Sequence, residues 1–176
     1  MIPETTARPL TQWSGLPQLI LHQAGWWACV IWMGWLGPAV MTLFLCVHLG
    51  VSRSRLGPEL TLIGVATIVG VVLDSALALG GAVTYVGDLK VWESPLWLVA
   101  IWAGFGATLM HSQAILVRTR LIAVLTGALG GPAAYWGGER LERMTVDPDV
   151  GWLAVSLAWT IAMVTLHTVA SNLRSS

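Results

Sequence analysis

The stretch LTQWSGLPQLILHQAGWWACVIWMGWLGPAVMTLFLCVHLG, residues 10–50, contains no Asp, Glu, Lys or Arg. A helix needs about 20 apolar residues to cross the hydrocarbon core of a bilayer, so this uncharged run is long enough for two spans. Gly34, Gly37 and Pro38 interrupt it near the middle, where a helix interior tolerates proline poorly. The stretch therefore predicts a tight hairpin of two membrane helices, at about 17–34 and 37–51.

The remainder of the chain repeats this pattern of apolar stretches separated by short charged loops. It predicts further spans at about 60–84, 95–117, 121–138 and 151–171. We therefore expect an all-α, polytopic transmembrane helical bundle of about six spans. It would form one domain, 17–171, between a short N-terminal tail, 1–16, and a C-terminal tail, 172–176. If the first hairpin were a single re-entrant element, the count would fall to five.

The composition agrees with a membrane protein. Of the 176 residues, 56% are hydrophobic and 10% are charged, against about 25% charged in an ordinary soluble domain. The formal net charge of zero excludes a typical nucleic-acid binder. The two cysteines, Cys29 and Cys46, fall inside predicted helices, where we expect reduced packing residues and no disulfide. We expect no cofactor and no bound metal.

The basic residues predict the orientation of the bundle. With the N-terminus inside, the cytoplasmic segments hold six arginines, whereas the other side holds three basic residues among six acidic ones. Both termini are therefore predicted to be cytoplasmic. On the outer side, Glu139 and Arg143 are four residues apart and are expected to pair on a solvated helix face.

Small residues recur at helical spacing in spans three, four and five, which predicts close packing of these three spans against each other. The stripes contain Gly70 in span three, Gly104 in span four, and Gly127 and Gly131 in span five. Pro132 should kink span five, and the backbone carbonyl that it frees then needs another partner.

Asp74 is the ionisable residue predicted to lie deepest in the membrane, and such residues are functional-site candidates. Counted from the span boundaries at about 1.5 Å per residue, Asp74 and Tyr135 reach nearly the same depth, so they are predicted to meet, with Ser75 close by. The pair could be a structural hydrogen bond between helices. Alternatively, it could be an acid–base pair or an ion site.

The four histidines, His22, His48, His111 and His167, belong to different spans and all fall in the cytoplasmic half. Gln23 and Ser112 lie at similar depths and are candidate ligand-binding residues. A ring of histidines could bind a metal, but no two of them share one helix at i,i+3 or i,i+4 spacing, so hydrogen-bonded or interfacial histidines are the simpler interpretation. His111 is retained as a third candidate catalytic residue, although it is expected to lie about 10 Å from Asp74 along the membrane normal.

Several segments together resemble a bacterial inner-membrane family catalogued as domain of unknown function number 2878. The resemblance rests on QAGWWAC at 23–29, LDS at 73–75, PLWL at 95–98 with Trp102, TLMHS at 108–112, and GGP at 130–132 with Tyr135 and Gly138. It implies a compact, multi-pass protein of the bacterial inner membrane without an assigned activity. Members of the family are often encoded beside enzymes that modify fatty acyl chains, which implies a lipid-related role. Trp26 and Trp102 lie inside predicted spans and also belong to these family-like segments. They are therefore candidate lining residues of a ligand-binding site.

Three functions fit these observations. The first is lipid handling or an enzymatic step on an acyl chain, with membrane lipid as the ligand and Asp74, Tyr135 and His111 as candidate catalytic residues. The second is a small transporter or channel. The third is a scaffold or accessory subunit for a partner membrane enzyme, in which Asp74 and Tyr135 only stabilise the fold. The sequence leaves the oligomeric state open.

Overall fold

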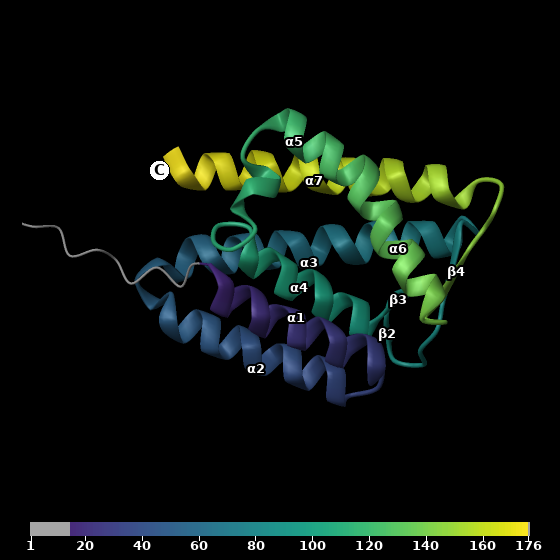
Figure 1. The fold of residues 1–176 in the computed structure, drawn as a ribbon, viewed down its shortest axis with the longest axis horizontal. Coiled ribbons are helices and arrows are strands. Elements are labelled where there is room, and N and C mark those ends of the chain that lie inside the picture. The colour runs from purple at the N-terminus through teal and green to yellow at the C-terminus, as the bar shows by residue number, and fades with distance from the viewer. Residues whose placement is uncertain (1–14, 176) are drawn as a thin grey trace, which may run out of the picture.

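The computed structural model describes residues 15–175, and most of this part of the chain is helical. The predicted N-terminal tail, 1–16, therefore lies almost wholly outside the described residues. The first hairpin consists of α1 (Leu16–Ile31) and α2 (Leu36–Val51). A short 3-10 turn, η1 (Arg53–Arg55), leads into α3 (Leu56–Leu79). These helices lie side by side along the long axis of the molecule (Figure 1).

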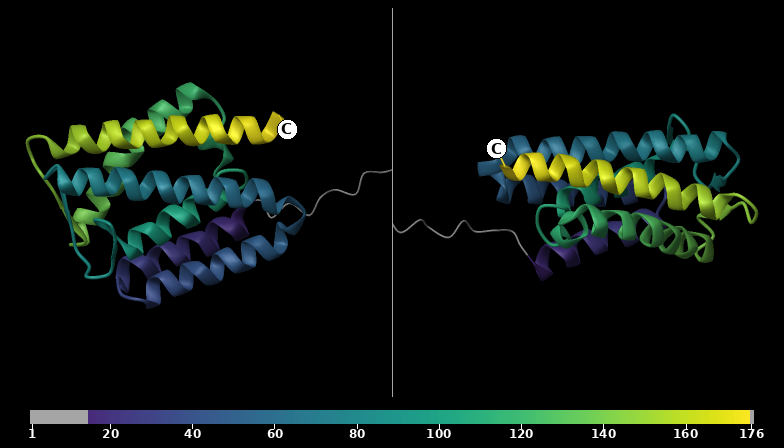
Figure 2. Two further views of the ribbon diagram at one scale, coloured as in Figure 1. Left: turned by 180° about the vertical axis from the view of Figure 1, so that it is seen from behind. Right: turned by 90° about the horizontal axis from the view of Figure 1, so that it is seen from above.

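The second half of the described chain adds α4 (Leu96–Thr108), the 3-10 turn η2 (Ala114–Val117), α5 (Arg120–Leu125), η3 (Thr126–Gly130), α6 (Gly131–Arg140) and α7 (Gly151–Ser175). The helix α7 lies along α3, and α5, η3 and α6 form one bent rod beside α7 (Figures 1 and 2). The helix α7 continues to Ser175, so the predicted tail at 172–175 is helical.

Four short strands, which the all-α prediction missed, lie at the end of the bundle where α3 ends and α4 begins (Figure 1). Strand β1 (Val83–Tyr85) pairs antiparallel with β4 (Met144–Val146), with Tyr85 opposite Met144. Strand β2 (Lys90–Val91) pairs antiparallel with β3 (Ser94–Pro95). The β1–β4 pair ties the α3 end to the loop before α7 and places Tyr85 over the end of α3.

The fourth predicted span is shorter than expected. The helix α4 ends at Thr108 rather than near residue 117, because the backbone N–H groups of His111 and Gln113 both turn back to the carbonyl of Thr108. Its 13 residues rise about 20 Å, which is less than the thickness of a bilayer core.

The small-residue stripes have different partners from those predicted. A Cβ on Gly127 or Gly131 would meet α7, at Thr160 and Trp159. Span five therefore packs through its stripe on α7, not on spans three and four. Gly104 of α4 faces Met41 of α2. The predicted contact between spans three and four is confirmed: α3 packs along α4, with Gly70 beneath the indole of Trp102.

The predicted kink before Pro132 is confirmed as the π-helical turn η3, which interrupts the rod between α5 and α6. Because proline has no N–H, the carbonyl of Ala128, four residues earlier, loses its helical partner. The hydroxyl of Ser156 in α7 donates to this carbonyl at 3.0 Å. The carbonyl that was expected to need a partner thus has one on the neighbouring helix.

The described surface is strongly apolar. Thirty large hydrophobic side chains are exposed, many of them on α1, α2, α3 and α7, whereas α4 lies inside the bundle and exposes none. Two helices, Arg53–Leu79 and Gly151–Ser175, are long and apolar enough to cross a membrane, and Leu36–Val51 and Leu96–Thr108 are shorter apolar helices. Exposed arginines gather where α2 joins α3, where α5 begins and near the C-terminus of α7, whereas the loops beside the strands carry acids (Figure 1).

Candidate functional site

Asp74 is the centre of a buried polar cluster formed by four segments of the chain, α3, β1, α4 and α6. Its carboxyl group is 1% exposed. Oδ1 accepts hydrogen bonds from the hydroxyls of Tyr135 and, at 3.3 Å, Tyr85. Oδ2 accepts one from the indole N–H of Trp102 at 2.7 Å. The predicted meeting of Asp74 with Tyr135 is thus confirmed, and Tyr85 and Trp102 complete the set of donors.

Each donor is held by a different local structure. Tyr85 is fixed by the β1–β4 pairing, and its hydroxyl lies 3.0 Å from that of Tyr135. Tyr135 follows Pro132 in the first turns of α6. Trp102 lies on Gly70 and stacks on Trp159 of α7, with ring centroids 4.7 Å apart. The cluster therefore connects α3, α4, α6 and the strand pair in one place.

The cluster fixes the direction of two buried hydroxyls. Burial raises the pKa of Tyr85 above its ordinary value, and the adjacent Asp74 carboxylate raises it further, so the Tyr85 hydroxyl keeps its proton and acts as a donor. Asp74 orients the Tyr135 hydroxyl while Tyr85 and Trp102 also bind its two oxygens. A hydroxyl held in this way can form a hydrogen bond with a polar headgroup that reaches Tyr135.

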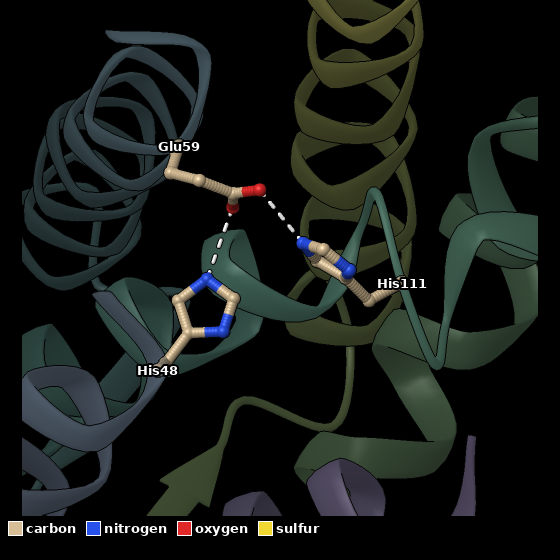
Figure 3. Close-up of side chains that lie close together, drawn as sticks. All are labelled: His48, Glu59 and His111. Carbon is tan, nitrogen blue, oxygen red and sulfur yellow. Dashed lines mark hydrogen bonds and ion pairs between the residues drawn. The ribbon is translucent and has the colours of Figure 1, made fainter. Parts of the chain in front are cut away.

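A second buried polar cluster surrounds Glu59 at the arginine-rich end of the bundle (Figure 3). Glu59, 1% exposed, accepts from Nε2 of His48 at 3.0 Å and meets Nε2 of His111 at 2.7 Å. The candidate catalytic residue His111 thus belongs to this cluster, whose contacts include none with Asp74. One ligand-type atom from each of the three side chains lies within 4.8 Å of the others, so the set has the composition of a metal site.

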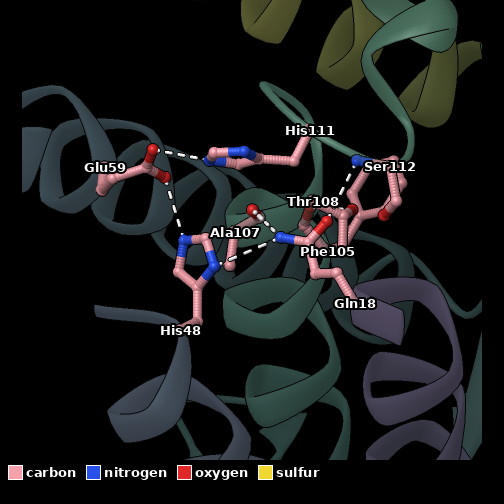
Figure 4. A network of polar contacts seen from close by, with 8 residues as sticks. All are labelled: Gln18, His48, Glu59, Phe105, Ala107, Thr108, His111 and Ser112. Carbon is pink, nitrogen blue, oxygen red and sulfur yellow. Dashed lines mark hydrogen bonds and ion pairs between the residues drawn. The ribbon is translucent and has the colours of Figure 1, made fainter. Parts of the chain in front are cut away.

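Hydrogen bonding by Gln18 opposes metal binding through His48 (Figure 4). The Gln18 amide is oriented by two backbone contacts, because Oε1 accepts from the N–H of Ser112 at 3.0 Å and Nε2 donates to the carbonyl of Ala107 at 3.1 Å. The Gln18 nitrogen also faces Nδ1 of His48 at 3.2 Å, so this Nδ1 must accept. The proton of neutral His48 is then on Nε2 and points at Glu59. A metal ion bound between His48 and Glu59 would need a lone pair on this Nε2, so the hydrogen bonding leaves no ligand atom of His48 for it.

A lateral groove lies beside the Asp74 cluster. We define it as three adjoining cavities between α1, α4, α6 and α7, with volumes of about 480, 60 and 170 Å³. Trp159 lines all three, Tyr135 lines the smallest, and Trp102 lines the third. The largest cavity is walled almost entirely by apolar side chains, among them Phe105, Leu116, Leu125, Leu129 and Met163. Two donors to Asp74 therefore face an apolar groove, while Asp74 itself lies behind them.

Comparison with models of protein families gave one match, over residues 16–165, to a family described as proteins of unknown function. The chain belongs to the DUF2878 family. The match covers nearly all of the described chain, including both polar clusters and the groove. Comparison with curated proteins and with solved structures gave no match.

The remaining predicted site residues of this DUF2878 protein occupy different positions. Trp26 and Gln23 line the groove, Trp26 in two of its cavities and Gln23 in the third. Ser75 is fully buried, and its hydroxyl accepts from the backbone N–H of Glu93 at 3.2 Å, so it supports a loop. Ser112 supplies the backbone N–H that holds Gln18. None of these contacts joins Ser75 or Ser112 to Tyr135.

The other two histidines do not join the Glu59 cluster. His167 donates from Nδ1 to the carbonyl of Val117 at 2.9 Å, as expected for a hydrogen-bonded structural histidine. His22 is buried and packs edge-on against Phe44, with ring centroids 5.8 Å apart.

Sequence reasoning missed Glu59, Gln18 and Tyr85. Glu59 occupies the first turn of α3, where an acidic residue is ordinarily a solvated partner of the helix dipole. Gln18 lies near the start of α1 among exposed residues and gave no signal. Tyr85 follows the predicted third span, but it is one of only two tyrosines in the chain, and this rarity was a signal that could have found it.

Proposed function

We propose that this DUF2878 protein is a multi-pass protein of the bacterial inner membrane that binds the acyl chain of a lipid in the lateral groove. One observation carries the proposal: an apolar groove between helices is lined by Tyr135 and Trp102, two of the three side chains that donate to Asp74. A water-soluble ligand would find few polar partners along these walls.

The surface supports a membrane setting. A soluble monomer rarely exposes contiguous apolar surface, whereas here large hydrophobic side chains are exposed along α1, α2, α3 and α7. All six predicted spans correspond to helical segments, two of which have the length and apolarity of complete spans. The arginine-rich end would face the cytoplasm by the positive-inside rule, with both termini on that side.

The shape of the groove supports an acyl chain as the ligand. A volume of about 480 Å³ for the largest cavity is within the usual range for small-molecule sites. Its rim includes the exposed side chains Leu125 and Leu129 on the bent α5–α6 rod, so a chain can enter sideways from the bilayer. The polar cluster lies beyond the narrower part of the groove, beside Tyr135.

Within this proposal, Tyr135 acts on the polar part of the lipid, and Asp74 acts through Tyr135. Asp74 would orient the Tyr135 hydroxyl, with Tyr85 and Trp102 holding the carboxylate. His111 has no part here, because it binds Glu59 in the other cluster.

A groove-filling variant tests the binding of the chain. Ala134 lines two of the cavities, so Ala134→Phe should block them. The matched control is Ala133→Phe, on the adjacent exposed position of α6. In nanodiscs containing a photoreactive acyl lipid, we expect Ala134→Phe to reduce labelling at least tenfold and Ala133→Phe to leave it unchanged. Equal labelling of both variants and of the native protein would refute the proposed binding site.

A scaffold function is the second candidate, because Asp74 is enclosed by its three donors. Asp74→Asn separates the two functions. If Asp74 serves the lipid, whole-cell lipid mass spectrometry should show the same change in the Asp74→Asn strain and in a deletion strain. If it serves only the fold, the variant should melt at a lower temperature in detergent while the lipid profile stays native in both strains.

A further inference from the structure

Arg143 is a half-buried cation without an acidic partner. Its Nε donates to the carbonyl of Val30 at the end of α1, at 2.7 Å. The ion pairs among residues 15–175 involve other side chains, and the predicted pair with Glu139 is absent from this part of the chain. Glu139 accepts instead from the backbone N–H of Val146 at 3.0 Å. The prediction of a solvated Glu139–Arg143 pair is therefore wrong.

The backbone directs the side chain of Arg143 inward. The helix α6 ends at Arg140, and Glu142 adopts a left-handed conformation with φ of 58°, which turns the chain back. The N–H of Arg143 then bonds to the carbonyl of Gly138 at 2.9 Å, and its carbonyl accepts from the N–H of Val86 at 3.0 Å. With both backbone groups engaged, the position of Arg143 is determined by the fold.

Arg143 lines the smallest cavity of the groove together with Tyr135. The other walls of this cavity are apolar, among them Trp26, Ile101 and Trp159. A guanidinium carries five N–H donors, and within residues 15–175 only the one on Nε has a protein acceptor. A cation beside apolar walls is costly unless an anion pairs with it, so the cavity is complementary to a negatively charged group.

We propose that Arg143 binds the carboxylate of a single-chain fatty acid whose hydrocarbon chain continues into the lateral groove. This inference rests on the proposed function and adds the chemical class of the ligand. The two terminal nitrogens of Arg143 make no hydrogen bond within residues 15–175, and a guanidinium fork matches the two oxygens of a carboxylate. The carboxylate would then lie in the same cavity as Tyr135.

The composition of the cavity walls favours a ligand with one anionic group and a single hydrocarbon chain. Arg143 is the one charged residue among the residues that line the smallest cavity, of about 60 Å³. The adjoining cavity of about 480 Å³ has almost no polar surface and suits a single hydrocarbon chain.

The first test compares three probes on the native protein in nanodiscs of uncharged lipid. Palmitic acid, methyl palmitate and phosphatidylglycerol are titrated, and binding is followed by native mass spectrometry. We expect palmitic acid to bind at least tenfold more tightly than its methyl ester, because only the acid offers a charge to Arg143. Binding of the acid and the ester with equal affinity would refute the role of Arg143 and leave the acyl groove intact. Binding of neither would refute the proposed function itself.

The second test removes the charge. Arg143→Gln should weaken palmitic acid binding about tenfold without affecting methyl palmitate, which corresponds to the loss of one charge-assisted contact. The control is Arg140→Gln, because Arg140 lies over the ring of Trp136 on the exposed side of α6. An equal effect of both variants would refute the assignment, as would phosphatidylglycerol binding that depends on Arg143 and exceeds that of palmitic acid. The comparison of acid and ester on the native protein decides the question even if Arg143→Gln fails to fold.

Discussion

Gly70 of α3 lies directly beneath the indole of Trp102: a Cβ added at Gly70 would come within 2.1 Å of Trp102 Cγ. This contact sets the height of the indole above α3 and so allows its N–H to reach Asp74, one turn further along the same helix. The hydrogen bond to Asp74 and the close approach of α3 to α4 therefore depend on a missing side chain.

Gly70→Ala should displace Trp102 and weaken its bond to Asp74. We expect a loss of about 1–3 kcal/mol, the usual cost of overpacking a core, measured as a lower Tm in detergent. The control is Gly64→Ala on the same helix, where an added Cβ meets open space. Because alanine favours helix over glycine by about 1 kcal/mol, Gly64→Ala should melt at the same or a higher temperature. Similar Tm values for the two variants would contradict the close contact.

Ser156→Ala should destabilise the bend of the α5–α6 rod, because the half-buried carbonyl of Ala128 would lose the hydroxyl that replaces its missing helical partner. The loss of one such hydrogen bond costs about 0.5–1.5 kcal/mol, so the Tm should fall. Thr165→Ala serves as a comparison on the same helix, since the Thr165 hydroxyl bonds only to its own helix at Ile161. An unchanged Tm for Ser156→Ala would show that the carbonyl of Ala128 needs no partner.

Tyr85 should keep its proton well above the ordinary tyrosine pKa of about 10. Burial is the main cause, followed by the charge of Asp74. Because Tyr85 and Tyr135 are the only tyrosines, the variant Tyr135→Phe reports on Tyr85 alone. We expect its tyrosinate absorbance to appear only when the protein unfolds. The folded state then holds a proton that the unfolded state releases, so stability is fully present below about pH 10 and falls as the pH rises further. Titration of the folded variant near pH 10 would contradict the burial of Tyr85.

His48 should carry its proton on Nε2, because Gln18 donates to Nδ1. Nitrogen NMR of the histidine rings can read this tautomer, and His167 provides an internal reference of the opposite kind, since its Nδ1 donates to Val117. We also expect neither a chelator nor added Zn²⁺ to change the Tm. Recovery of one metal ion per chain, with a Tm that falls on chelation, would overturn the tautomer argument.

The sequence was informative where a polar residue stands alone in an apolar helix. The contact between Asp74 and Tyr135 could be predicted because the number of residues from each span boundary, multiplied by the constant helical rise, gives the depth of each side chain. The partner of the Ala128 carbonyl could be anticipated because Pro132 removes a hydrogen bond whatever the tertiary fold. These inferences need only helical geometry.

Other contacts depend on the turns and short strands that follow the helices. The periodicity of apolar residues along the sequence does not predict the conformation of these segments. Glu139 and Arg143 would face each other on a continuous helix, but α6 ends at Arg140, and the turn at Glu142 sends Arg143 to the opposite side. Tyr85 reaches Asp74 only because two three-residue strands pair across the end of the bundle. Short strands of this kind carry too little pattern to be recognised in advance.

Trp159 is the wall shared by all three cavities of the lateral groove, and its ring rests against Trp102 and Phe105. The path from the wide apolar chamber to the two smaller ones therefore passes this one side chain. A smaller residue at the same position would enlarge the space open to a hydrocarbon chain. The side chain at position 159 therefore limits the length of hydrocarbon chain that the groove can hold.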